Sequence, residues 1–158
     1  MKKNIINVLN IINKKLKNKK IKWIIGGSTS LSLQGIKLKK ISDIDIATDK
    51  KGAFKINEIF KEYEIKPVKF SKNRIISSYR GKLKIKNIEV DVMGELSEKI
   101  GNRWVNISRQ RLKSPKFIKI RNNRIPVTPL EQHLVPYKIL RRKKDNEKIK
   151  KIERMLKK

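Results

Sequence analysis

The sequence predicts an α+β fold in which one mixed β-sheet is flanked by helices. In several segments apolar residues recur every three or four positions, which is typical of amphipathic helices, and in others they alternate with polar residues, which is typical of half-buried strands. The two kinds of segment interleave along the chain, and this order favours a single sheet covered by helices. A chain of 158 residues that is 37% hydrophobic supplies one modest core.

The elements of the N-terminal half follow from these patterns in order. Residues 3–18 carry Ile5, Leu9, Ile12 and Leu16 at helical spacing, and the lysines after them suit a helix C-terminus. The short apolar run 21–25 predicts a buried strand. The elements expected next are a helix at 29–34 that Gly35 ends, a strand at 41–47 and a helix at 52–63.

The chain from residue 65 onward is predicted to hold three longer strands, a region of short strands and loops, and two helices. The strands cover 65–70, 74–80 and 82–93, with Arg80-Gly81 as a hairpin turn. Residues 103–127 are expected to form short strands and loops. The features expected there are breaks at Pro115 and Pro126, a helix from Pro129 that is kinked or restarted at Pro136, and a final helix at about 146–157.

Charge is the most unusual property of the composition. The chain has 43 Lys+Arg against 14 Asp+Glu, a formal net charge of +29. Residues 65–87 and 99–130 contain basic residues and no acidic one, so each suits a nucleic-acid backbone. The alternative is a codon bias toward Lys, Asn and Ile, although such a bias would supply Glu as readily.

The composition also excludes several classes of protein. Without cysteine there are no disulfides, thiolate metal sites or cysteine nucleophiles, and a single histidine, His133, argues against a Ser-His-Asp triad. No apolar run is long enough to span a membrane, and asparagines interrupt what would be an apolar signal core. We therefore expect a cytoplasmic protein.

Carboxylates lie inside two apolar strands. Alternation in 41–46 places Asp43 and Asp45 on one face of a strand, and alternation in 88–93 does the same for Glu89 and Asp91. Aspartate is depleted in strands, and neighbouring carboxylates repel one another unless a cation such as Mg²⁺ lies between them. The alternative is an edge strand with one hydrated face.

A glycine turn precedes the first acidic strand. Gly26-Gly27-Ser28 follows the run 21–25 and begins a helix, an arrangement that lets backbone N–H groups approach phosphate. Taken alone, it is equally a tight turn followed by an N-cap serine. Together with the acidic strands it suggests a metal-assisted phosphoryl-transfer site.

These residues resemble the nucleotidyltransferase superfamily of DNA polymerase β, whose signature is a strand, Gly-Gly or Gly-Ser, a helix, an h-D-h-D-h strand (h, apolar) and a later acidic strand. Here Gly26-Gly27-Ser28 precedes Asp43-Ile44-Asp45 by fourteen residues, slightly more than in the tightest form, and Ser42 replaces an apolar residue. The chain is similar to small stand-alone members: the AbiEii/MenT-type toxin transferases and the lincosamide and aminoglycoside transferases. Residues 125–145 are similar to the closing helix pair of these proteins.

The resemblance implies a polymerase β palm-like domain over 1–158, with an N-terminal helix at 3–18, a catalytic core at 20–127 and a C-terminal helical pair at 129–157. It implies a Mg²⁺-dependent transfer of NMP from an NTP such as ATP. Two Mg²⁺ ions, or Mn²⁺, are expected at Asp43 and Asp45, with Asp91 binding the metal that activates the acceptor hydroxyl. Nucleotide binding is expected at Gly26, Gly27, Ser28, Lys138 and Asp145.

The acceptor is inferred from charge, since a fold does not decide it. An aminoglycoside is a polycation, so a strongly basic chain argues against it and favours an RNA 3′ end, such as that of tRNA. A separate antitoxin partner would fit a toxin-like enzyme, and the alternative from another class is a non-catalytic RNA- or DNA-binding protein. The candidate nucleic-acid contacts are Arg74, Arg80, Lys82, Arg109 and Arg111, whose alternative is a solvated face.

Overall fold

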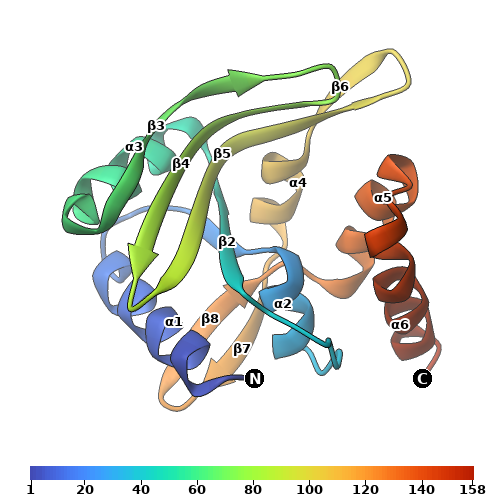
Figure 1. The fold of residues 1–158 in the computed structure, drawn as a ribbon, viewed down its shortest axis with the longest axis horizontal. Helices are drawn as coiled ribbons and strands as arrows, with labels where there is room; N and C mark the ends of the chain where they lie inside the picture. The colour runs from blue at the N-terminus through green and yellow to red at the C-terminus, as the bar shows by residue number, and fades with distance from the viewer.

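The computed structural model describes residues 1–158 and confirms the predicted fold class, because a mixed β-sheet carries helices on both sides (Figure 1). Seven of the eight strands follow the order β3-β4-β5-β2-β1-β8-β7, and the eighth, β6, pairs with β5 beside this path. Strand β2 runs parallel to β5 and β1 parallel to β8, whereas the other neighbours are antiparallel. The strands are β1 (Trp23–Ile25), β2 (Asp43–Thr48), β3 (Glu64–Lys72), β4 (Ile76–Ile85), β5 (Ile88–Ile100), β6 (Arg103–Asn106), β7 (Lys116–Ile120) and β8 (Asn123–Val127).

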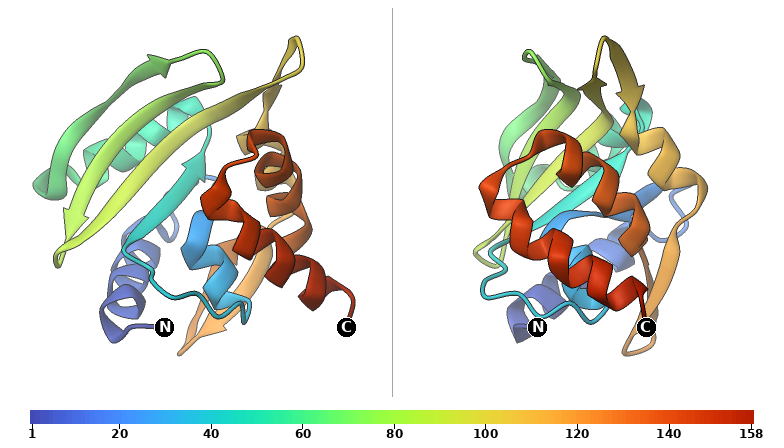
Figure 2. Two further views of the ribbon diagram at one scale, coloured as in Figure 1. Left: turned by 45° about the vertical axis from the view of Figure 1, so that its right-hand side comes forward. Right: turned by 90° about the vertical axis from the view of Figure 1, so that its right-hand side faces the viewer.

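Helices lie on the two sides of the sheet and belong to two hydrophobic clusters. The larger cluster joins α1 and α3 to the strands, and the smaller joins α2, α5 and α6. Figure 2 shows α5 and α6 on the side of the sheet away from α1 and α3. The helices are α1 (Lys3–Leu16), α2 (Gly27–Leu33), α3 (Lys50–Ile59), α4 (Ile107–Lys113), α5 (Leu130–Leu140) and α6 (Asn146–Leu156), with the 3₁₀ turns η1 (Lys61–Tyr63) and η2 (Lys143–Asp145).

The apolar spacing of the first helix is confirmed by its packing. Ile5, Leu9 and Ile12 are fully buried and lie on one face of α1, which covers the sheet. Burying a leucine or isoleucine side chain stabilises a fold by about 1.5–3 kcal/mol. This helix therefore stabilises the sheet from the side opposite α5 and α6. No helix of the structure combines the length and the apolar character that crossing a bilayer requires.

Two local predictions are wrong. Arg80 and Gly81 lie in the middle of β4 and form no hairpin turn, since the turns fall at 73–75 and 86–87. Gly81 instead accommodates a close approach of β3, because a Cβ atom there would lie 2.7 Å from the Val68 Cγ2 atom. Pro126 does not break its strand, as it pairs with Phe117 inside β8.

The region 103–127 also contains a helix that the sequence patterns did not predict. Helix α4 begins after Asn106, whose side-chain oxygen accepts a hydrogen bond of 2.8 Å from the backbone N–H of Arg109. An asparagine in this position satisfies a donor that the helix itself leaves unpaired. The helix packs against β5 and β2, the two strands that carry the carboxylates.

Candidate active site

Three aspartates meet where β2 and β5 run side by side. The parallel register places Asp45 opposite Asp91 and Asp43 opposite Glu89. One carboxylate oxygen from each of Asp43, Asp45 and Asp91 lies within 4.8 Å of the other two. The sheet thus brings together three acidic side chains from segments almost fifty residues apart in the sequence.

The surroundings of Asp45 disfavour its ionised form. Burial, followed by the charges of Asp43 and Asp91, raises the pKa of the Asp45 carboxyl to about 6, although Arg111 and Arg80 act in the opposite direction. A buried carboxylate is less stable than a hydrated one, and like charges nearby add to the penalty. A cation between the three carboxylates would remove this penalty.

The donor set fits a divalent metal ion. The Asp91 Oδ1 atom is buried and has no hydrogen-bond partner, and its nearest cations are Arg80 Nη2 at 3.7 Å and Lys82 Nζ at 3.9 Å. A carboxylate oxygen without a hydrogen-bond partner is available to coordinate a metal ion, and hard carboxylate oxygens are the donors that Mg²⁺ and Mn²⁺ prefer. Asp43, Asp45 and Asp91 are therefore the residues that would hold such an ion.

The glycine turn is held against the acidic strand β2 by hydrogen bonds. Gly26 N–H donates to the Asp45 carbonyl oxygen at 2.9 Å, and the Thr29 hydroxyl donates to the Asp43 carbonyl oxygen at 2.8 Å. Gly27 has a φ of +56°, and a Cβ atom on it would overlap the Asp45 carboxylate. Only glycine fits this close approach, so the turn and the carboxylates form one unit.

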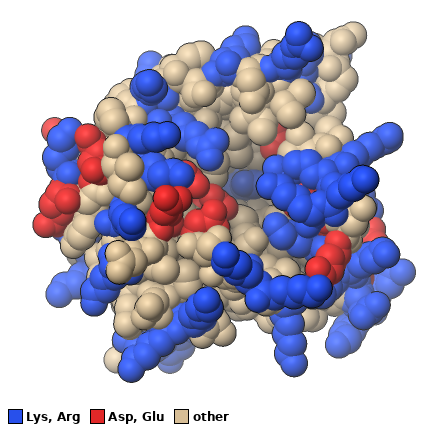
Figure 3. Space-filling view, viewed as in Figure 1, with Lys and Arg blue, Asp and Glu red and all other residues tan.

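A cleft of about 420 Å³ lies between these strands and the C-terminal helices. Gly27, Ser28 and the three aspartates line one part of it, and side chains of α5, η2 and α6 line the other. Figure 3 shows acidic side chains gathered on one rim of a hollow and Lys and Arg side chains on the opposite rim. The basic residues that line the cleft are Arg80, Arg111, Arg142, Lys144 and Lys148.

His133 is a neutral residue of the cleft wall. It is 1% exposed, and burial, with a further contribution from the charge of Arg111, lowers its pKa to about 3. Its Nε2 atom lies 3.1 Å from the Ser30 hydroxyl, whose proton is donated to the Thr128 carbonyl oxygen at 2.8 Å. The imidazole therefore donates to Ser30 through Nε2–H.

The two nucleotide-binding residues expected near the C-terminus lie outside the cleft lining. Lys138 Nζ pairs with Glu153 Oε1 at 2.6 Å on the exposed side of α5. Asp145 is completely buried and accepts from Arg142 Nε at 2.6 Å, with Lys148 Nζ at 3.6 Å. Asp145 thus positions Arg142 and Lys148, which do line the cleft.

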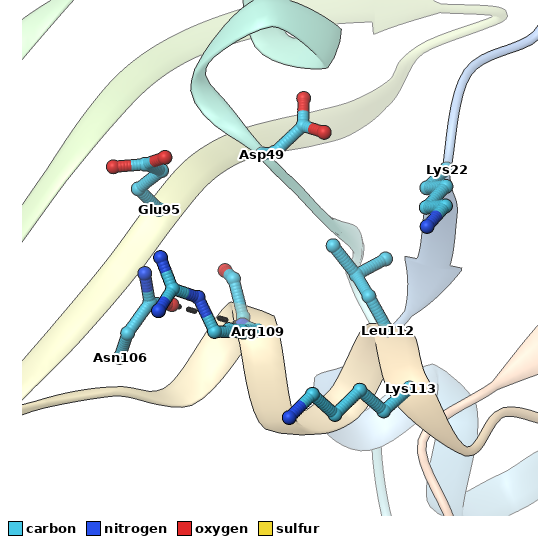
Figure 4. Close-up of a pocket in the computed structure, with 8 residues that line it drawn as sticks. Lys22, Asp49, Glu95, Asn106, Arg109, Leu112 and Lys113 are labelled. Atoms are coloured by element: carbon cyan, nitrogen blue, oxygen red, sulfur yellow. Dashed lines mark hydrogen bonds between the residues drawn. The ribbon is translucent and has the colours of Figure 1, made fainter.

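The residues expected to contact nucleic acid are dispersed. Arg74 is exposed in the turn between β3 and β4, and Lys82 pairs with Glu89 at 3.0 Å. Arg109 lines a separate hollow of about 360 Å³, which Figure 4 shows between α4 and the segment that holds Asp49. Arg80 lines the cleft, and so does Arg111, which is only 7% exposed and so lies away from the surface where contact was expected.

Several cleft residues were missed by sequence reasoning. Tyr137 and Glu98 are buried in its wall, and the pKa of Tyr137 rises to about 12 because of burial and the charge of Asp145. The lysines and arginines of 141–148 form a run that could have indicated a phosphate-facing segment. Nothing in the local sequence marks Glu98.

The fold, the acidic triad and the glycine turn together define a nucleotidyltransferase. More particularly, the chain belongs to the aminoglycoside-2''-adenylyltransferase family, whose model matches residues 7–152. The structure is similar to that of a candidate nucleotidyltransferase from Thermotoga maritima, with 34% sequence identity and a TM-score of 0.82 over 96% of this chain and 93% of that one.

A second solved structure shares the fold alone. It is ANT(2'')-Ia in complex with adenylyl-2''-tobramycin, with 10% identity and a TM-score of 0.62 over 97% of this chain and 90% of that one. No protein of curated function matches the sequence. The comparisons thus establish the enzyme class and the family.

Proposed function

We propose that this enzyme is a Mg²⁺-dependent adenylyltransferase that transfers AMP from ATP to a hydroxyl of an RNA 3′ end, such as that of tRNA. The observation that carries the proposal is the convergence of Asp43, Asp45 and Asp91 beneath the Gly26–Ser28 turn in one cleft. ATP is the donor in keeping with the adenylyltransferase family to which the chain belongs.

In this reaction the acceptor oxygen forms a bond to the α-phosphorus, the bond from the α-phosphorus to the bridging oxygen breaks, and pyrophosphate leaves. Two Mg²⁺ ions, when bound, would stabilise the attacking and leaving oxygens. Asp43, Asp45 and Asp91 would supply carboxylate ligands to these ions, and the Asp91 oxygen that is not bound to metal would accept the proton of the acceptor hydroxyl. Gly27 and Ser28 line the same cleft as Asp45, so the triphosphate would lie there against the glycine turn.

The charge of the cleft supports a polyanionic acceptor. Its lining holds five basic residues, and of its four acidic ones three belong to the triad that a metal would neutralise. A polycationic substrate would meet Arg142, Lys144 and Lys148 on the rim, and like charges at close range disfavour binding. A formal net charge of +29 further favours a nucleic-acid acceptor.

An aminoglycoside hydroxyl is the second candidate acceptor, because the family model bears that substrate's name and the fold matches an aminoglycoside-bound enzyme. A toxin-like role of AbiEii/MenT type, held in check by an antitoxin protein, is compatible with RNA as the acceptor. It predicts that expression of the active chain alone arrests growth, whereas the Asp43→Asn, Asp45→Asn variant does not.

A transfer assay tests the proposal. The purified protein is incubated with Mg²⁺, each α-labelled NTP, and either total RNA or tobramycin, with the Asp43→Asn, Asp45→Asn variant as the control. We expect label from ATP in RNA with the intact protein only. Label in tobramycin would instead identify an aminoglycoside hydroxyl as the acceptor. Tight RNA binding without label anywhere would favour the non-catalytic nucleic-acid-binding alternative.

Salt dependence tests the acceptor class separately. Each phosphate contacted in single-stranded RNA contributes about 0.7 to the slope of log affinity against log salt, so binding should weaken steeply. A flat dependence would contradict an RNA acceptor even if transfer to another hydroxyl were observed.

A further inference from the structure

The guanidinium of Arg111 is a buried cation that the protein leaves unpaired. Arg111 is 7% exposed, and its Nε atom has no hydrogen-bond partner. It takes part in none of the salt bridges of the structure. Buried charges are normally paired and hydrogen-bonded, because an uncompensated one is strongly destabilising. A buried arginine without a partner in the protein is therefore suited to bind an anionic ligand.

The position of Arg111 indicates where that ligand would lie. Its Nη1 atom lies 3.6 Å from the place that a Cβ atom on Gly26 would take, and the side chain lines the same cleft as Gly27 and Ser28. Helix α4 packs against both β5 and β2, so the guanidinium is held beside the glycine turn. A ligand above the turn would meet Arg111 from the side of α4.

The groups around Arg111 do not neutralise it. Asp45 and Glu98 attract its charge, but neither forms an ion pair with it, and the Glu98 Oε2 atom is itself buried without a partner. His133 is uncharged, and Arg142 lines the same cleft with a further positive charge. The guanidinium thus faces a space that favours an anion.

We infer that Arg111 binds the polyphosphate tail of the nucleotide beside the Gly26–Ser28 turn. The inference rests on the proposed function and adds to it a phosphate-binding residue that comes from neither the glycine turn nor the C-terminal helices. A guanidinium can donate two parallel hydrogen bonds to two phosphate oxygens, and burial strengthens both of these hydrogen bonds. In the transfer reaction the positive charge of Arg111 would also stabilise the negative charge that develops on the departing pyrophosphate.

A purely structural role makes the opposite prediction for stability. If Arg111 existed to pair with Glu98, then Arg111→Met would leave a buried carboxylate unpaired and destabilise the fold. If Arg111 awaits a ligand, the same substitution removes an uncompensated buried charge, so the ligand-free protein keeps its melting temperature or gains in it.

Binding of Mg²⁺-tripolyphosphate, measured by calorimetry at 0.15 M salt, tests the inference without any catalytic step. The matched control is Arg109→Met, which removes the same charge from the same helix but lines the other hollow. We expect Arg111→Met to weaken binding about tenfold or more, the value of a charged hydrogen-bonded contact, and Arg109→Met to change it less than about twofold. Arg111→Lys should give an intermediate affinity for tripolyphosphate, because lysine keeps the positive charge but cannot donate the bidentate pair of hydrogen bonds.

Equal affinities for Arg111→Met and wild type, or no binding to wild type, would overturn the inference. A drop in melting temperature for Arg111→Met with unchanged tripolyphosphate binding would establish the structural role instead. These outcomes are distinct from failure of the proposed function. Tripolyphosphate binding that depends on Arg111, without any NMP transfer, would support the phosphate site and contradict the proposed transfer reaction. Conversely, if the wild type transfers NMP and Arg111→Met binds tripolyphosphate as tightly as the wild type, the proposed function would stand and the role of Arg111 would be contradicted.

Discussion

Asp45→Asn should make the metal-free protein more stable. The native pKa of Asp45 is about 6 against an ordinary value of 3.8, because the carboxyl is buried beside Asp43 and Asp91. Above pH 6 the fold therefore holds a charged group that the unfolded chain accommodates more easily. One pKa unit corresponds to about 1.4 kcal/mol, so the shift amounts to about 3 kcal/mol of destabilisation that asparagine removes.

The size of the effect falls as the pH is lowered, while its sign stays the same. Because the native pKa is raised, the native state takes up a proton between pH 6 and pH 4 that the unfolded chain does not, and wild-type stability gains accordingly. The difference between Asp45→Asn and wild type should be largest at pH 8 and should nearly vanish at pH 4. His133 contributes equally to both proteins and cancels from the comparison.

Urea unfolding in EDTA at the two pH values measures this difference. Added Mg²⁺ should then stabilise the wild type and leave Asp45→Asn almost unchanged, since a ligand that binds only the native state raises its stability. If Asp45→Asn were less stable than wild type at pH 8 without metal, the aspartate would be a structural residue. The assignment of the triad as a metal site would then be refuted.

Three further substitutions test the neighbouring structure. Gly27→Ala should cost at least about 1–2 kcal/mol because of its positive φ, and should abolish transfer because the new Cβ atom overlaps the Asp45 carboxylate; unaltered kinetics would contradict the close approach. His133 has a lowered pKa, so wild type should lose stability relative to His133→Gln as pH falls below 6.5, by about 3 kcal/mol at pH 4 in parallel melts. Leu9→Ala should lower the free energy of unfolding by about 2–5 kcal/mol, since this side chain is fully buried under the sheet; a smaller loss in urea titrations would place α1 outside the core.

The acidic strands could be predicted because their signal is local. Alternation alone places Asp43 and Asp45 on one face, and both lie on the cleft side of β2. Their pairing with Asp91 depends on a parallel register between strands far apart in the sequence, and no local pattern encodes it. The resemblance to nucleotidyltransferases supplied that link before the structure did.

The basic residues were harder to assign, since lysine and arginine occur throughout the chain. The resemblance implied that Lys138 binds the nucleotide, yet its side chain pairs with Glu153 across α5 and α6. Arg111 lies in a basic stretch and was expected at the surface, but an unpredicted helix carries it into the cleft. The asparagine cap at 106 was the one local sign of that helix.

The hairpin prediction failed for a different physical reason. Glycine in a strand marks either a turn or a close approach of another backbone, and the sequence does not distinguish the two. At Gly81 the close neighbour is Val68 of β3, where the pairing shifts register. Only the three-dimensional arrangement decides between these uses.

The most direct test of the central claim is a crystal structure with Mn²⁺ and a non-hydrolysable ATP analogue, in which anomalous scattering locates the metal. We expect metal between Asp43, Asp45 and Asp91, with the triphosphate beside the Gly26–Ser28 turn. A nucleotide seated elsewhere, or an anomalous map without metal at the three aspartates, would contradict the assignment of this cleft as the active site.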